Sequence, residues 1–205
     1  VYCCSDSTVS TVGSKSAEGK MSPRNMLTTT IGDELKIATD FKAKVIGVSL
    51  KDRAAILPAG HAADGAYWID YSTGTFISST YYMKELPKWA VDYNKSIGKV
   101  TKDQICYTPL GNKITEEMAK AAVAGEQLGG DNVTDLLAVS FSCTDMIGHK
   151  YGTHSDKTRE IYVDLDKRLA DLFGYLDQNV GKDQYLVFLM ADHGAANSIL
   201  LSREH

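Results

Sequence analysis

Asp192 and His193 are the residues whose types and position first suggest chemistry, because they directly follow a short apolar run. Residues 185–190 read Tyr-Leu-Val-Phe-Leu-Met, and a run of this length and composition predicts a strand buried on both faces. In open α/β sheets, ligands bind at the carboxyl ends of the strands. We therefore expect Asp192 and His193 to lie at a binding edge of a sheet.

Two more predicted strands, at 43–50 and 135–142, are also followed by charged or metal-ligating side chains, namely Lys51, Arg53, Asp145 and His149. If the three strands are parallel, their carboxyl ends meet at one edge, where all six side chains could converge. Carboxylate oxygen and imidazole nitrogen are ligands that suit zinc. Lys51 and Arg53 alternate along extended chain, so both can point the same way and offer a cationic pair to a phosphate group.

Each of these pairs also has a simpler structural explanation. An Asp-His pair on its own is usually a cap or a hydrogen-bonded pair. Asp145 and His149, four residues apart, could be neighbours on the surface of a helix, and Lys51 and Arg53 could be a solvated strand end. Their joint position at one sheet edge favours the functional interpretation.

The elements that must position these residues alternate between helix and strand, which predicts an α/β fold with a parallel sheet flanked by helices. Helices are expected at 23–40 (with Ser22 as N-cap), 83–96, 115–128 and 157–180. Residues 54–66 are expected to be a connection. The segments 66–71 and 75–81 flank Ser72-Thr-Gly and predict a β-hairpin. We expect one domain, with 66–82 as a hairpin insertion.

The composition is that of a globular domain: 205 residues, 43% hydrophobic and 23% charged, with a net charge of −4. This balance gives no general attraction to nucleic acid or to an anionic membrane, so no nucleic-acid partner is expected. No apolar run is long enough to span a membrane. The four cysteines do not fix the redox compartment. The chain begins Val-Tyr-Cys-Cys, so either processing has removed its start or it is an excerpt of a longer protein.

Two segments resemble the metal-ligand motifs of the alkaline phosphatase superfamily, in its type I phosphodiesterase/nucleotide pyrophosphatase branch. They are Thr-Asp-Met-Ile-Gly-His-Lys-Tyr-Gly at 144–152 and Met-Ala-Asp-His-Gly-Ala at 190–195. The segment Ser-Leu-Lys-Asp-Arg at 49–53 narrows the resemblance. Together with the segments at 22–25 and 56–61, it is similar to bacterial alkaline phosphatases of the PafA type.

The resemblance implies an alkaline-phosphatase-like fold, two zinc ions per site and a covalent phosphoryl-enzyme. Asp145 and His149 would bind one zinc ion, and Asp192 and His193 the other. Lys51 and Arg53 would hold the non-bridging oxygens of the phosphoryl group. The implied substrates are small phosphate monoesters, and the implied location is periplasmic or secreted.

The sequence also departs from the family pattern. Catalytic zinc usually takes three protein ligands, whereas each pair here supplies two, and no counterpart of the nucleophilic hydroxyl is found. The hydroxyl clusters at 28–30 and 78–80 are expected to be structural, and His61 and His154 are weak candidates for further ligands. We therefore expect an internal piece of a larger enzyme, lacking its N- and C-terminal parts and showing little turnover alone.

Three alternatives stay open. A phosphodiesterase or pyrophosphatase of the same branch would keep the zinc ligands without needing Lys51 and Arg53. The chain could also be a non-catalytic module that binds metal or phosphate. Finally, it could be an α/β domain whose strand-end charges have no function. Cofactor-independent phosphoglycerate mutases share the Asp-His-Gly motif, but the segment at 49–53 argues against them.

Overall fold

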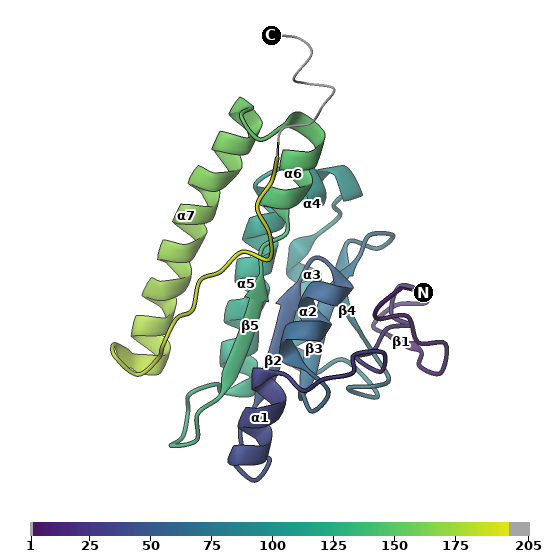
Figure 1. Ribbon diagram of the computed structural model, residues 1–205, viewed down its shortest axis with the longest axis vertical. Coiled ribbons are helices and arrows are strands. Elements are labelled where there is room, and N and C mark those ends of the chain that lie inside the picture. Colours follow the sequence, from purple (N-terminus) through teal and green to yellow (C-terminus); the bar gives the residue numbers. More distant parts are fainter. Residues whose placement is uncertain (1, 197–205) are drawn as a thin grey trace.

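A five-stranded sheet with the strand order β1-β4-β3-β2-β5 forms the centre of the computed structural model, which describes residues 2–196 (Figure 1). The strands are β1 (Thr11–Val12), β2 (Val45–Ser49), β3 (Gly65–Asp70), β4 (Thr75–Ser79) and β5 (Leu136–Ser140). β2 runs parallel to both β3 and β5, whereas β4 runs antiparallel to β3 and β1. The expected α/β fold is confirmed, with a parallel centre and an antiparallel flank.

Seven α-helices are present among the described residues: α1 (Ile31–Ala38), α2 (Asp52–Ala59), α3 (Lys88–Ile97), α4 (Lys102–Tyr107), α5 (Leu110–Glu126), α6 (Cys143–Tyr151) and α7 (Asp156–Leu176). A π-helical turn, Asp177–Gly181, follows α7. The predicted hairpin is present as β3 and β4, and β3 also pairs with β2, so the hairpin extends the main sheet. The long helix expected at 157–180 corresponds to α7 and its π-helical turn.

The two faces of the sheet bury different residues, because neighbouring side chains of a strand point to opposite sides. Tyr67 and Ile69 of β3 pack into the larger core with Met118 of α5, whereas Ala66 and Trp68 pack into a smaller core that includes residues of α2. All five residues of β2 are buried. β2 therefore lies between two apolar layers, which explains its run of apolar residues.

The helix expected at 23–40 begins only at Ile31, so its predicted start is wrong. Thr30 is the N-cap and forms a capping box with Asp33, which fixes the first turn. Leu27 and Ile31 are 99% and 68% exposed, so these two apolar side chains do not face the core. The buried residues of α1 are Gly32, Asp33 and Lys36. Polar contacts, not an apolar stripe, attach this helix.

Three helices were not expected, namely α2, α4 and α6. α2 covers the first part of the predicted connection at 54–66. Pro58 in its last turn makes this helix hard to recognise from the sequence. Proline is compatible with helical φ, but it lacks an N–H and suggests a loop. α4 is the second unexpected helix, and α5 starts at Leu110, five residues before the predicted start at Thr115.

The strand predicted at 185–190 is not formed, so this prediction is wrong. Leu186, Phe188 and Met190 are 78%, 71% and 83% exposed, and no residue from 185 to 190 pairs with any described strand. β-propensity reflects packing against neighbouring strands and covering elements. Without those neighbours, the apolar composition does not produce a strand. In Figure 1 the segment, drawn in yellow, rises from the lower end of α7 toward α6.

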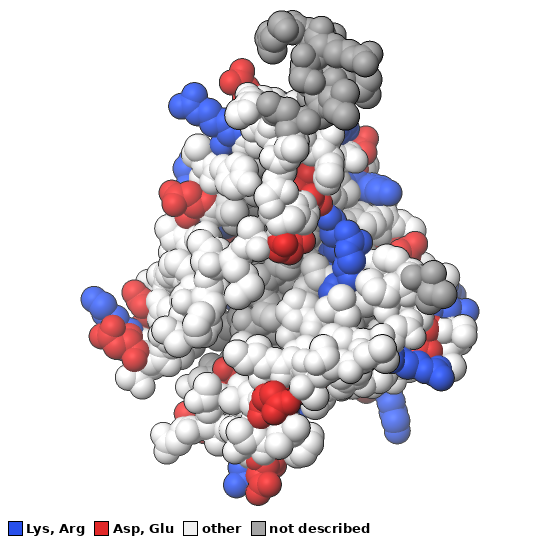
Figure 2. All heavy atoms as spheres, in the orientation of Figure 1, with Lys and Arg blue, Asp and Glu red and all other residues white. Residues whose placement is uncertain are grey.

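Charged side chains are distributed without a dominant sign over the face shown in Figure 2, where basic and acidic groups are interspersed. Within residues 2–196, none of the helices combines the length and apolar character that crossing a bilayer requires.

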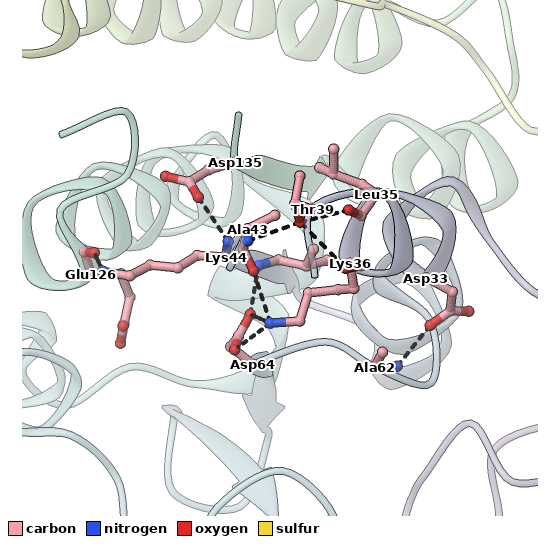
Figure 3. A network of polar contacts seen from close by, with 11 residues as sticks. Asp33, Leu35, Lys36, Thr39, Ala43, Lys44, Ala62, Asp64, Glu126 and Asp135 are labelled. Atoms are coloured by element: carbon pink, nitrogen blue, oxygen red, sulfur yellow. Dashed lines mark hydrogen bonds and ion pairs between the residues drawn. The ribbon is translucent and has the colours of Figure 1, made fainter. Parts of the chain in front are cut away.

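Lys36 ties α1 to the amino-terminal end of β2 (Figure 3). Its ammonium group donates to the carbonyl oxygen of Ala43 at 2.8 Å and to the two carboxylate oxygens of Asp64 at 2.8 and 2.9 Å. Asp64 also accepts from the backbone N–H of Val45 at 2.8 Å. This network orients the strand whose opposite end leads to Lys51.

Candidate metal and phosphate site

The carboxyl ends of β2 and β5 are joined by buried hydroxyl groups. Ser49 Oγ lies 3.2 Å from Ser142 Oγ and donates to the carbonyl oxygen of Ser140 at 3.1 Å. These contacts place the start of α2 beside the start of α6. Ser49 and Ser142 were not predicted as part of the site, although their position at strand ends is the same signal that drew attention to Lys51.

Asp145 is the centre of the site. It lies in the first turn of α6, where a carboxylate is favoured by the helix dipole. Its Oδ2 accepts from Lys51 Nζ at 2.5 Å, and its Oδ1 lies 3.0 Å from His149 Nε2, one helical turn away. Burial acts to raise the pKa of Asp145, but the hydrogen bond and charge of Lys51, with His149 and His193, lower it overall. The group is therefore an ionised acceptor.

His193 joins the same carboxylate from the C-terminal segment. Its Nε2 lies 3.7 Å from Asp145 Oδ1 and 3.7 Å from Asp192 Oδ2, and its Nδ1 lies 2.8 Å from the carbonyl oxygen of Gly194. The Gly194 carbonyl and the Asp192 carboxylate raise the pKa of His193. His193 thus approaches Asp145 without the predicted strand, while the side chain of Asp192 remains 91% exposed.

Arg53 does not point the same way as Lys51, so this geometric expectation is wrong. Lys51 is the N-cap of α2 and Arg53 lies in its first turn, so the chain there is not extended. Arg53 Nη1 donates to the hydroxyl of Tyr2 at 3.3 Å, and that hydroxyl donates to Asp52 Oδ1 at 2.6 Å. Burial and the Asp52 carboxylate raise the pKa of Tyr2 to about 12. Nothing in the sequence indicated this role of Tyr2.

The weaker candidates lie elsewhere. His61 Nε2 is 3.2 Å from the carbonyl oxygen of Thr28, and within the described residues neither His61 nor His154 contacts Asp145. Thr30 caps α1, and Ser78 donates to the carbonyl of Ala66 inside the sheet. Thr30 and Ser78, one from each hydroxyl cluster, therefore have structural roles.

The donor atoms around Asp145 are of the right kind for zinc, with one carboxylate and two imidazoles. Within residues 2–196, however, no three acidic, histidine or cysteine side chains are arranged to hold a metal ion. The cation in contact with the carboxylate is instead the ammonium of Lys51. The residues around Asp145 fit zinc by the chemistry of their donor atoms.

The mixed sheet defines an α/β domain, and sequence comparison identifies its family. The family model for type I phosphodiesterase/nucleotide pyrophosphatase matches residues 25–199. The chain belongs to this family.

The curated relatives include alkaline phosphatases. PhoV of Synechococcus elongatus is 43% identical over 96% of this chain and 44% of its own length. PafA of Elizabethkingia meningoseptica is 43% identical over 100% of this chain and 47% of its own length. A relative from Myroides odoratus, named calcium-transporting ATPase, is 41% identical over 97% of this chain and 45% of its own length. The chain spans less than half the length of each of these relatives.

The crystal structure of wild-type PafA superposes on the whole chain. The TM-score is 0.95 at 44% sequence identity, and the match covers 100% of this chain and 49% of that one. The fold is therefore that of an alkaline phosphatase over the region compared.

Proposed function

We propose that this chain forms part of a zinc-dependent enzyme that hydrolyses phosphate monoesters. The observation that carries the proposal is the meeting of Lys51, Asp145, His149 and His193 at one end of the sheet. A lysine beside acid and imidazole groups combines a phosphate-binding cation with metal-ligating atoms. The similarity to alkaline phosphatases supports the substrate class.

In this proposal, Asp145 and His149 hold one zinc ion, and Asp192 and His193 hold the second. Bound zinc would polarise phosphoryl oxygens and stabilise the deprotonated, reactive form of the nucleophile. Lys51 and Arg53 would bind the non-bridging oxygens and offset the charge on the transferring group. For Arg53, this role requires its side chain to turn away from the hydroxyl of Tyr2.

The proposed reaction passes through a covalent phosphoryl-enzyme. An enzyme hydroxyl oxygen attacks phosphorus, the bond to the leaving alcohol breaks, and water then releases phosphate. We place the nucleophile and the remaining zinc ligands outside these 205 residues, because each residue pair here supplies only two ligands and Thr30 and Ser78 have structural roles. We also propose a periplasmic or secreted location and small-molecule substrates.

Metal analysis and turnover measurements test the proposal. We expect the chain to bind zinc and Asp145→Ala to abolish that binding, while hydrolysis of 4-nitrophenyl phosphate stays near background. A chain that takes up no zinc contradicts the metal site. Rapid zinc-dependent hydrolysis by the chain alone contradicts an external nucleophile.

A phosphodiesterase or pyrophosphatase of the same family is the second candidate. The contact of Arg53 with Tyr2, away from Asp145, favours it, because diester hydrolysis would not need both cations. Inorganic phosphate binding to the zinc-loaded chain, followed by ³¹P NMR, separates the two. The monoesterase proposal expects Arg53→Ala to weaken phosphate binding, whereas the alternative expects no change.

A further inference from the structure

Both carboxylate oxygens of Asp145 are already engaged in this structure. Lys51 Nζ contacts Oδ2 at 2.5 Å, and the imidazole of His149 contacts Oδ1 at 3.0 Å. The Lys51 side chain is 20% exposed and that of Asp145 is 26% exposed. This ion pair is thus partly removed from water. In such a partly buried site, a charged carboxylate without a partner would be costly.

The base of Lys51 is fixed while its side chain can move. Its backbone N–H donates to Ser49 Oγ at 3.2 Å, and the residue stands as N-cap of α2. The lysine stem is a flexible chain of four carbons. Rotation about the bonds of the side chain can therefore move the ammonium while the backbone of Lys51 stays in place.

We propose that Lys51 is an internal counter-cation, which neutralises Asp145 in the metal-free protein and is displaced when zinc binds. The inference rests on the zinc site of the proposed function and adds an order of events to it. Metal binding comes first and releases the ammonium, which then becomes available to a phosphate group. Lys51 thus couples metal loading to phosphate binding.

The electrostatics of the site supports this exchange. A divalent ion bound through Asp145 and His149 would stand beside the ammonium, and the two positive charges would repel each other strongly at low effective dielectric constant. His149 Nε2 would also have to leave its contact with Asp145 Oδ1 and offer its lone pair to the metal. Zinc affinity is therefore lowered by the work of removing Lys51 from the carboxylate.

Zinc competition with a chromogenic chelator tests the inference on the 205-residue chain. We expect Lys51→Met to bind zinc at least about tenfold more tightly than the wild type. Lys51→Arg retains the charge and is expected to stay close to the wild type. Lys99→Met removes an exposed lysine between α3 and α4 and controls for net charge. His149→Ala is expected to weaken binding.

NMR of the lysine side chains provides a second measurement that needs no variant. In the metal-free wild type we expect a protected Lys51 ammonium signal, and one equivalent of zinc should shift it and accelerate its exchange with water. A zinc affinity that does not respond to Lys51→Met, or a Lys51 signal that zinc leaves unchanged, overturns the exchange alone. Failure of every variant and of the wild type to bind zinc overturns the zinc site as well.

Discussion

At the scale of single residues, Lys36 is a nearly buried cation whose charge is balanced by the carboxylate of Asp64. Its side chain is 7% exposed and its ammonium contacts both carboxylate oxygens of Asp64. Removing one partner of such a pair leaves the other without compensation, and that costs more than the pair contributes when intact. The partner at risk here is the lysine, because Asp64 is more exposed.

We expect Asp64→Ala to lower the free energy of unfolding by about 2 kcal/mol, below the value for fully buried pairs because the Asp64 side chain is 39% exposed. Lys36→Met should cost less, since water can reach the remaining carboxylate. Urea unfolding measures both. Glu85→Ala, at an exposed acid, is the matched control, and an equal loss in that variant would contradict the argument.

Asp70 is a buried carboxylate whose ionisation makes the stability depend on pH. Burial acts to raise its pKa, but hydrogen bonds from Ser72, Ser14 and Ser16 outweigh it and lower the pKa to about 2. The carboxylate accepts from Ser72 Oγ at 2.6 Å and from Ser14 Oγ at 2.7 Å. Because the folded-state pKa lies below the unfolded value, this stabilisation is complete above about pH 4 and is lost as the pH falls toward 2.

The expected result is a destabilised Asp70→Asn variant at pH 7 whose deficit relative to the wild type shrinks between pH 4 and pH 2. Chemical denaturation at several pH values measures the difference in unfolding free energy. The exposed Asp166→Asn on α7 should show no such convergence. A deficit for Asp70→Asn that is constant with pH would be incompatible with the lowered pKa.

At the scale of elements, the contact between β2 and α2 depends on a glycine in the middle of β2. A Cβ atom added at Gly47 would overlap the carbonyl oxygen of Ala55 and press on the methyl group of Ala59. Both belong to α2, so the helix can pack this closely only against a bare backbone. The close approach also places the first turn of α2, and hence Lys51, at the end of the sheet.

Gly47→Ala is therefore expected to cost about 3 kcal/mol, at the upper end for overpacking because backbone atoms cannot move aside. Gly174→Ala is the matched control, since a Cβ there meets no atom within 4 Å. In the last turn of α7, which the π-helical turn continues, this exchange should stabilise the protein by about 0.5–1 kcal/mol. Thermal unfolding measures the melting temperature of both variants. Shifts of the two melting temperatures in the same direction would refute this account.

The same elements show how far the sequence predicts the site. The meeting of Lys51, Asp145 and His149 follows from strand ends, a rule that depends only on parallel pairing. The direction of Arg53 was not predictable, because α2 begins at that point and Pro58 makes the segment resemble a loop. The core strands and α7 were predictable because the pattern of their apolar residues matches the side chains that other parts of this chain bury.

At the scale of the whole molecule, the strand predicted at 185–190 failed to form because the described residues do not cover that segment. Strand formation depends on neighbours that a local pattern does not contain. Residues 136–140 pair with β2 on one side only within the described residues. The apolar composition favours burial of these side chains, but no described strand or helix packs over the segment.

An uncovered, extended segment is also what a protease binds. Proteolytic nicking concentrates where the backbone is exposed and lacks hydrogen bonds. Within the described part of the chain, no hydrogen bond between backbone groups holds residues 185–196. With Phe188 and Leu189 71% and 76% exposed, limited digestion with chymotrypsin should cut here before it cuts the core. Mass spectrometry of the early products identifies the site, and first cleavage within α5 or β2 would contradict the prediction. Such a cut would separate His193 from Asp145 and leave the sheet intact. Breaking a single peptide bond would therefore divide the proposed metal centre between two fragments.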